Sequence, residues 1–167
     1  MRVDWSAVYR EMYEDLVRFL HRKVWDADRA QDLAQEAFMR ALDHDPDNPR
    51  AFLFTIANNL ARDEARAAVR QRHHLTLIKA ETQDRAVVDP TQEMEHEQRM
   101  AAVRRALDQL SERDREVLLL WDAGFNYEEI AEQAGLAVKA VGTTLSRARR
   151  RLVEAHEALE DRDVAHR

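Results

Sequence analysis

Five cationic side chains near the C-terminus could together bind an anionic polymer. Between residues 138 and 152 the chain carries one lysine and four arginines and no acidic residue, although the whole 167-residue chain has a net charge of −6. Clustered Lys and Arg neutralise phosphates, and Arg can donate two hydrogen bonds to a guanine edge. The segment therefore predicts a DNA-contacting helix. Its expected contacts are Lys139, Thr143, Thr144, Ser146, Arg147 and Arg150.

The flanking residues predict a helix-turn-helix that positions this basic segment. Asn126 can cap a short helix while Glu129 reaches back to it, and Gly135 supplies the positive φ of a tight turn. A second helix over 138–152 has an apolar stripe opposite its cations. The alternative is a solvated helix end whose arginines interact with the helix dipole. The agreement of cap, turn and stripe favours the DNA-binding interpretation.

Other patterns that could hold a metal or support catalysis are incomplete. The alternating acids Asp43, Asp45 and Asp47 open like a calcium loop, but the sixth and twelfth positions are Asn48 and Phe54 instead of Gly and Glu. The pair His96–Glu97 begins like a zinc-protease motif, but Met100 stands where its second histidine belongs. No cysteine and no phosphate-binding glycine loop are present. We therefore expect no enzymatic activity, no metal and no cofactor.

A second basic stripe is expected on a long helix in the first half of the chain. Asn58, Arg62, Arg66 and Arg70 recur every four residues and share one helix side. An ordinary solvated helix face with ion pairs four residues apart would also explain this stripe. The presence of another basic helix elsewhere in the chain favours a shared nucleic-acid ligand.

Composition and periodicity predict an all-α protein with two small helical domains joined by a linker. Hydrophobic residues make up 45% of the chain and charged residues 35%, which suits helices with polar outer faces. We expect domains over 1–74 and 96–167, with an acidic, flexible linker over 75–95. No apolar run approaches membrane-spanning length, no signal peptide is apparent and there is no cysteine, so a cytoplasmic location is expected.

Helix start signals divide the first domain into three helices. The first is expected over Trp5–Val24, and the second from about Arg29, capped by Asp28 with Gln31. The third is expected from Asn48 and Pro49 to about His74. Its predicted core row is Phe52, Ile56 and Leu60, with Leu53, Ala57 and Ala61 beside it. We expect Phe52 to pack in the core, and leave Phe54 open between core packing and base contact.

The second domain is expected to contain two helices before the helix-turn-helix. Asp89, Pro90 and Gln92 resemble a capped helix start, and an apolar stripe follows at helical spacing. Ser111 can cap the next helix, and Gly124 is placed to end it in the left-handed conformation.

Three segments in this order resemble the bacterial extracytoplasmic-function, or group IV, sigma factors of the sigma-70 family. Residues 26–42 (DADRAQDLAQEAFMRAL) are similar to the family's polymerase-binding pattern in region 2. Residues 48–66 (NPRAFLFTIANNLARDEAR) resemble its promoter-melting and minus-10-reading segment. Residues 110–152 resemble region 4, which reads the minus-35 element. One segment alone would be unspecific, but three in order, with a linker between the second and third, are specific.

The resemblance implies a transcription initiation factor for a stress or envelope regulon. Its implied partners are the clamp helices and flap of core RNA polymerase, promoter DNA and an anti-sigma factor, without membrane insertion. The implied polymerase contacts are Asp32, Leu33, Gln35, Glu36 and Phe38. The implied minus-10 contacts are Asn58, Arg62, Arg66 and Arg70. The loop 43–48 would help to capture an extruded base by stacking and edge contacts.

Two departures from the family pattern bear on DNA reading. The recognition helix has Gly142, Thr143 and Thr144 where the family often has a Lys-Ser-Arg run, so its preferred promoter does not carry over. Asn58 stands where the family often has Arg before the common Asn, here Asn59, which we expect to be structural. Two other functions remain open at this stage: a sigma-factor mimic that sequesters an anti-sigma factor, and a plain helix-turn-helix regulator.

Overall fold

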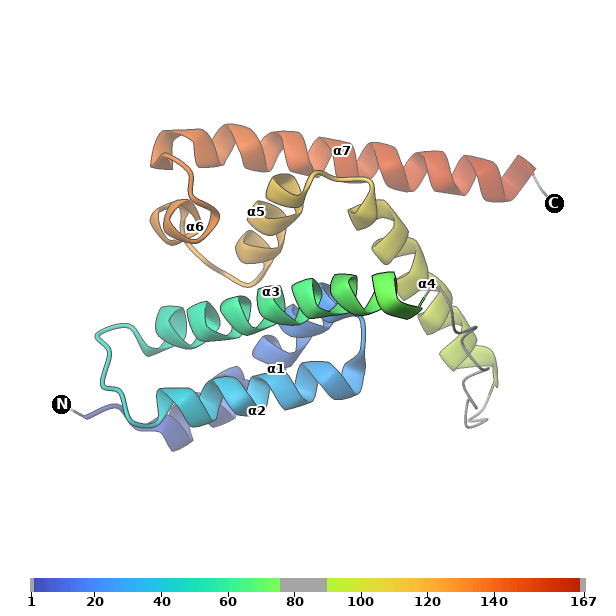
Figure 1. Ribbon diagram of the computed structural model, residues 1–167. Coiled ribbons are helices and arrows are strands. Elements are labelled where there is room, and N and C mark those ends of the chain that lie inside the picture. Colours follow the sequence, from blue (N-terminus) through green and yellow to red (C-terminus); the bar gives the residue numbers. More distant parts are fainter. Residues whose placement is uncertain (1, 76–89, 166–167) are drawn as a thin grey trace. The chain divides into compact units, whose positions relative to one another are not determined.

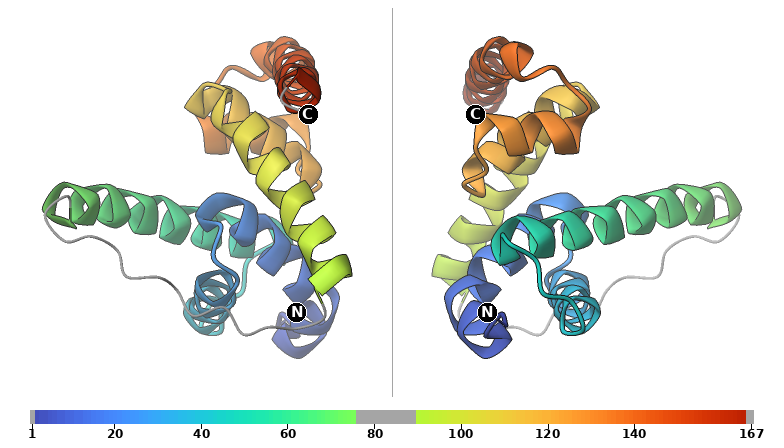
Figure 2. Two further views of the ribbon diagram at one scale, coloured as in Figure 1. Left: turned by 90° about the vertical axis from the view of Figure 1, so that its right-hand side faces the viewer. Right: turned by 90° about the vertical axis from the view of Figure 1, so that its left-hand side faces the viewer.

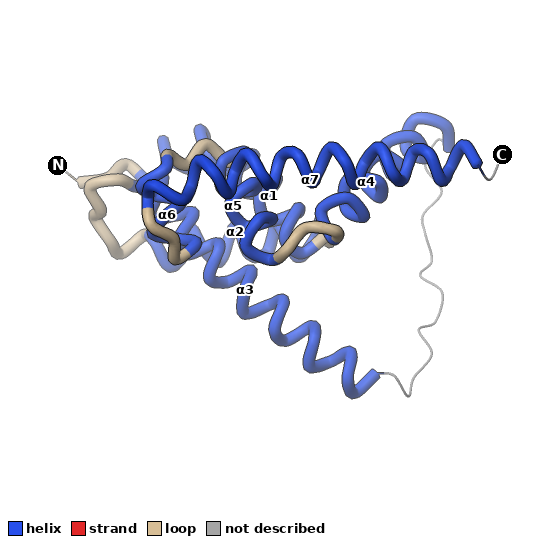
Figure 3. The backbone as a smooth tube through the Cα atoms, turned by 90° about the horizontal axis from the view of Figure 1, so that it is seen from above, coloured by secondary structure: helices blue, strands red, loops and turns tan. Residues whose placement is uncertain are grey.

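The computed structural model describes residues 2–75 and 90–165, apart from the side chains of 68–75, 90–91 and 163. The described residues form seven helices joined by loops and contain no strand, as Figure 3 shows, which confirms the all-α expectation. Their bounds are α1 Trp5–Val24, α2 Ala27–Ala41, α3 Pro49–Leu75, α4 Pro90–Asp108, α5 Glu112–Asp122, α6 Tyr127–Ala134 and α7 Val138–Ala165 (Figure 1). None of these described helices is long and apolar enough to cross a membrane.

The chain divides into two compact units, Met1–Glu81 and Thr82–Arg167. Helix α4 starts at Pro90, so residues 90–95, expected in the linker, are helical and belong to the second unit. The remainder of the expected linker lies almost entirely outside the described residues.

The first unit is a three-helix arrangement in which α1, α2 and α3 contact one another pairwise. Leu16, Leu20 and Phe19 of α1 are buried, and the Phe19 ring lies 5.5 Å from the Phe54 ring of α3. Figure 2 shows the C-terminal half of α3 projecting beyond α1 and α2. The C-terminal part of α3 therefore extends past the core of this unit.

Two local expectations for this unit are wrong. The cap of α2 is Asp26, whose carboxylate accepts from the Arg29 backbone N–H at 3.1 Å, so the helix starts before Asp28. Trp25, in the left-handed conformation, ends α1 directly before Asp26, so Asp26 is the first extended residue.

The buried row of α3 is shifted by one position from the expected row of Phe52, Ile56 and Leu60, which is only half-buried. The buried residues of α3 are Leu53, Phe54, Ala57, Asn58 and Ala61.

The second unit contains the expected helix-turn-helix with its local signals intact. Asn126 and Glu129 form a reciprocal capping box, with both hydrogen bonds at 2.9 Å. Gly135 ends α6 with φ +68°, a conformation that favours glycine. Helices α5, α6 and α4 all pack on α7. Beyond the expected end near Leu152, α7 continues to Ala165, so it is much longer than the sequence pattern indicated.

Candidate nucleic-acid interface

Helix α7 presents one polar face away from its buried stripe. Val141, Leu145 and Ala148 are almost completely buried. The opposite side carries exposed polar and cationic side chains from the predicted minus-35 set: Lys139, Thr143, Ser146 and Arg150. A helix surface of this kind can place cations against phosphates and hydroxyls against base edges. Four of the six predicted residues therefore share one accessible face.

Thr144 and Arg147 occupy different environments from the other four predicted residues. Thr144 is only 6% exposed, which corrects the expectation that it faces DNA, because it lies one helical turn from buried Val141 and from buried Ala148. Arg147 is half-exposed, and its Nη2 donates to Asp114 Oδ1 at 2.8 Å. Asp114 is the third residue of α5, so this guanidinium links two helices.

A buried carboxylate, that of Asp114, accepts hydrogen bonds from two arginines of α7. Asp114 is fully buried, and its second oxygen accepts from Arg151 Nη1 at 2.9 Å. The hydrogen bond from Arg147 is the main cause that holds the pKa of the Asp114 carboxyl below its ordinary value, and burial opposes it. The same bond raises the pKa of Arg147. Both groups are therefore charged at neutral pH, and the buried charge is compensated. We call Asp114, Arg147 and Arg151 the α5–α7 clamp.

Sequence reasoning missed the clamp because its partners are far apart in the chain. An acid in the first turn of a helix is usually explained by the helix dipole. The only available signal was the spacing of Arg147 and Arg151, four residues apart on one side of α7.

Another α7 arginine contacts an aromatic pair. Arg149 lies over the Trp121 ring at 5.4 Å, and the Trp121 and Tyr127 rings are 5.6 Å apart. The Tyr127 ring also faces Gly142, where an added Cβ would meet it at an ordinary contact distance of 3.5 Å. The space around Gly142 therefore does not require a glycine.

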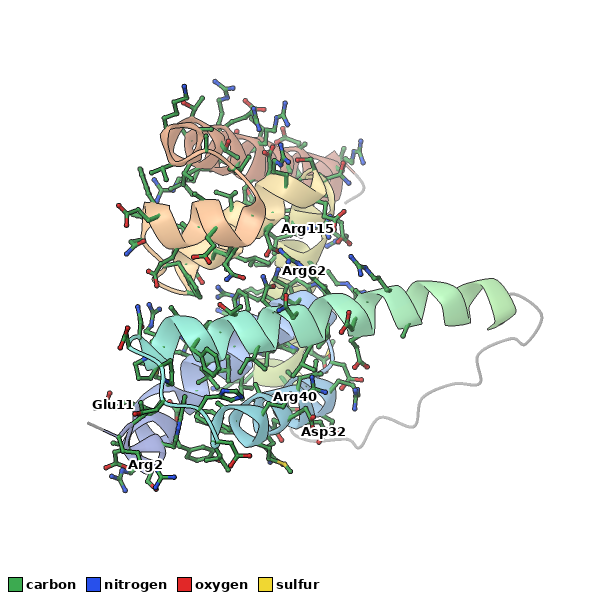
Figure 4. The ribbon with its side chains drawn as sticks, turned by 60° about the vertical axis from the view of Figure 1, so that its left-hand side comes forward. Arg2, Glu11, Asp32, Arg40, Arg62 and Arg115 are labelled. Carbon is green, nitrogen blue, oxygen red and sulfur yellow. The ribbon has the colours of Figure 1, made fainter. Side chains whose placement is uncertain are left out.

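On α3, the two neighbouring asparagines have the reverse of their expected environments. Asn58 is fully buried, whereas Asn59 is exposed. Burial removes Asn58 from the accessible minus-10 set, because its side chain shares the core row of Leu53, Ala57 and Ala61. Arg62 is half-buried and Arg66 is exposed, and Figure 4 shows Arg62 near the middle of α3. The side chain of Arg70 lies outside the described residues.

The N-terminal residues hold the loop between α2 and α3. The Val3 backbone N–H donates to Asp45 Oδ1 at 2.6 Å, and the Trp5 indole N–H donates to the His44 carbonyl at 3.1 Å. The His44 ring lies 5.2 Å from the Phe52 ring. Phe52 is therefore part of the support of this loop, while Phe54 is in the core. The loop is anchored from both sides.

Helix α2 separates the predicted polymerase contacts into two layers. Asp32 and Gln35 are exposed and Glu36 is half-buried, whereas Leu33 and Phe38 are 5% and 6% exposed. Burial corrects the expectation that Leu33 and Phe38 are directly accessible to the polymerase, because both pack in the core. Figure 4 shows Asp32 and Arg40 on α2, where Arg29 pairs with Asp32 and Arg40 with Glu36. Ion pairs as exposed as these contribute little, so they leave the acids available to a partner.

An apolar groove of about 510 Å³ lies beside this acidic face. The largely buried Phe38 lines this groove, and the exposed fractions of Tyr9, Met39 and Leu42 are 42%, 66% and 54%. Gln35 and Trp5 also line the groove, so the groove adjoins the polar residues of α2.

The described residues contain no group of three His, Cys, Asp or Glu that could hold a metal ion.

Comparison with known proteins matches both units to one family. Residues 8–71 match the family described as Sigma-70 region 2, and residues 100–152 match Sigma-70, region 4. The RNA polymerase sigma factor YlaC of Bacillus subtilis is 30% identical over 149 residues, which cover 85% of this chain and 86% of YlaC. The sigma factor EcfG of Rhodopseudomonas palustris is 37% identical over 76% of this chain and 71% of its own length.

Two solved structures resemble this one over nearly its whole length. The sigma factor RpoE of Bartonella quintana, in complex with the anti-sigma factor NepR, has a TM-score of 0.69 and 25% identity, covering 92% of this chain and 97% of RpoE. CnrH, in complex with the cytosolic domain of CnrY, has a TM-score of 0.65 and 27% identity, covering 95% of this chain and 88% of CnrH. The chain therefore belongs to the extracytoplasmic-function sigma factors of the sigma-70 family, and it is an alternative sigma factor whose partners are core RNA polymerase and promoter DNA.

Proposed function

We propose that α2 docks on the clamp helices of core RNA polymerase, that α7 reads the minus-35 element, and that α3 with the loop 43–48 engages the minus-10 strand. The observation that carries this division is the presence of two compact units, each with its own accessible charged face. The acids of α2 suit a protein partner, and the cations of α7 suit phosphates.

The polymerase contact combines the acidic residues of α2 with the groove beside them. Asp32, Gln35 and Glu36 supply polar contacts, and Met39 and Leu42 supply apolar area at the adjoining groove. An interface with an apolar centre and a polar rim has this composition. The flap of the polymerase is proposed as a further contact of the second unit.

The minus-10 contacts are proposed for Arg62, Arg66 and Arg70, with Asn59 replacing buried Asn58. The loop 43–48, which hydrogen bonds from Val3 and Trp5 hold in place, is proposed to receive an extruded base. Stacking and edge contacts with such a loop can offset the few kcal/mol that base extrusion costs. At the other end of the promoter, Lys139, Thr143, Ser146 and Arg150 contact the minus-35 element.

An anti-sigma factor is proposed as a third partner, because RpoE was solved in complex with the anti-sigma factor NepR and CnrH in complex with the cytosolic domain of CnrY. The exposed apolar residues Tyr9, Met39 and Leu42 offer such a partner a place on the first unit. We further propose that the protein acts in the cytoplasm by binding alone, without catalysis, and that it directs a stress or envelope regulon.

Reversal of charge on α2 tests the polymerase contact. Asp32→Lys with Glu36→Lys should reduce association with core polymerase at least tenfold, because like charge replaces attraction at the contact. The lost intrahelical pairs are exposed and worth only a few tenths of a kcal/mol each, so the helix should remain folded. Association is measured by native binding of the full chain to fluorescent core enzyme.

The matched control carries the same charge change on another helix. Glu11→Lys with Glu14→Lys alters exposed residues on the side of α1 away from its buried Leu16 and Leu20. This control should associate like the unchanged protein. Equal association of both double variants would show that the α2 face is not the polymerase contact.

A further inference from the structure

The α5–α7 clamp holds the recognition helix at two successive turns. Arg147 and Arg151 are four residues apart. They donate hydrogen bonds to different carboxylate oxygens of Asp114, at 2.8 and 2.9 Å respectively. The position of Asp114 is itself fixed, because its backbone N–H donates to the Ser111 hydroxyl at 3.1 Å. One buried carboxylate therefore connects the start of α5 to about one turn of α7.

The clamp resists rotation of α7 more strongly than apolar packing does. Val141, Leu145 and Ala148 are buried by apolar contacts, which are non-directional and therefore fix the rotation of a helix less sharply than hydrogen bonds of defined geometry. A fully buried carboxylate has less freedom, since a rotation that drew both arginines away would leave its charge uncompensated. The clamp thus selects one rotation from those that the apolar stripe allows.

Rotation decides which side chains face a groove of DNA. One residue corresponds to a turn of 100° about the helix axis. Lys139, Thr143 and Arg150 lie opposite the buried stripe, whereas Arg147 and Arg151 lie on the flank that faces α5. A partial turn of α7 would therefore misplace every side chain on the outward face at once.

We propose that Asp114 is a positioning residue for minus-35 recognition, and that Arg147 and Arg151 orient α7 while other side chains read the bases. This inference rests on the proposed function of α7. It also separates two roles for the arginines of one helix: Arg150 contacts DNA, while Arg147 acts through the clamp.

The test is the base preference of the holoenzyme at each position of the minus-35 element. The full chain is combined with core RNA polymerase, and promoters randomised over this element are selected by binding and sequenced. The variants are Asp114→Asn and Arg147→Gln. The matched control is Glu112→Gln, which removes one acid from the exposed start of the same helix.

If the clamp positions α7, the variants should lose base preference over the whole minus-35 element. Asp114→Asn and Arg147→Gln should each weaken the preference about two- to tenfold at all contacted positions, as expected for coupled residues. Glu112→Gln should leave every preference unchanged. The proposal is overturned if Arg147→Gln relaxes one base pair alone, by the roughly 5- to 150-fold of a lost bidentate arginine contact. It is also overturned if Asp114→Asn leaves the preferences intact.

Unfolding would weaken DNA binding without changing base preference, so thermal unfolding of each variant is measured in parallel. If Asp114→Asn fails to fold, Arg147→Gln decides the question, since Arg151 still compensates the buried carboxylate. If the protein without any substitution shows no base preference over the minus-35 element, the proposed function of α7 is overturned, and this inference with it.

Discussion

The salt dependence of promoter binding should depend on two of the five cations in the first half of α7. Arg147 and Arg151 bind Asp114, and Arg149 lies over Trp121. Lys139 and Arg150 remain on the outward face. The double variant Lys139→Ala, Arg150→Ala should therefore remove two phosphate contacts and leave the fold intact.

The expected size follows from counterion release. Each phosphate contact contributes about 0.9 to the slope of log affinity against log salt, so two contacts contribute about 1.8. When the salt rises from 50 to 200 mM, both proteins lose affinity. The factor by which affinity falls should be about twelve times smaller for the double variant than for the unchanged protein. Fluorescence anisotropy of a labelled promoter with holoenzyme, repeated over this salt range, measures the slope.

The matched control removes two exposed arginines from α4 of the same unit. Arg99→Ala with Arg105→Ala changes the net charge equally but leaves α7 untouched. Its slope should equal that of the unchanged protein. The assignment of the DNA-facing side of α7 is refuted if the control lowers the slope as much as the α7 variant, or if the α7 variant leaves it unchanged.

Three further predictions concern stability and loop position. Gly142→Ala should raise the free energy of unfolding by about 1 kcal/mol, because alanine favours a helix interior and its Cβ meets Tyr127 at an ordinary distance; a lower unfolding temperature would contradict this. The lowered pKa of Asp114 means that its stabilising effect is complete above its unfolded pKa of about 3.9 and is lost as pH falls through the folded value. Asp114→Asn should therefore have a lower free energy of unfolding than the unchanged protein in urea at pH 7, and the difference should shrink as the pH falls below about 3.9; a difference that stays constant with pH would argue against this linkage. Trp5→Phe, which loses the indole N–H bond to His44, should slow promoter opening in permanganate footprinting while minus-35 binding stays the same; equal opening rates would show that the bond does not position the loop.

Local signals in the sequence were sufficient for most helix boundaries. Asn48, Asn126 and Gly135 act through hydrogen bonds or backbone angles within a few residues, and each stands where expected. The order of the helices and the helix-turn-helix follow from such short-range features, together with apolar periodicity.

The misplaced residues depend on contacts between distant segments. In α3 two adjacent rows are apolar, and only the packing of α1 and α2 decides that Phe54 rather than Phe52 is buried. The same choice buries Asn58 and exposes Asn59. In the sequence, Asp114 looks like an ordinary acidic residue in the first turn of a helix. Its pairing with Arg147 and Arg151 arises only when α7 packs against α5. Local periodicity carries no information on these choices.

Promoter-directed initiation by this protein is tested by run-off transcription with core RNA polymerase on a pool of genomic promoter fragments, with and without the protein. The transcript starts are then sequenced. New starts that share two upstream elements at a constant spacing are expected. A folded protein that binds the core enzyme yet yields no new starts would contradict promoter reading by α7 and α3.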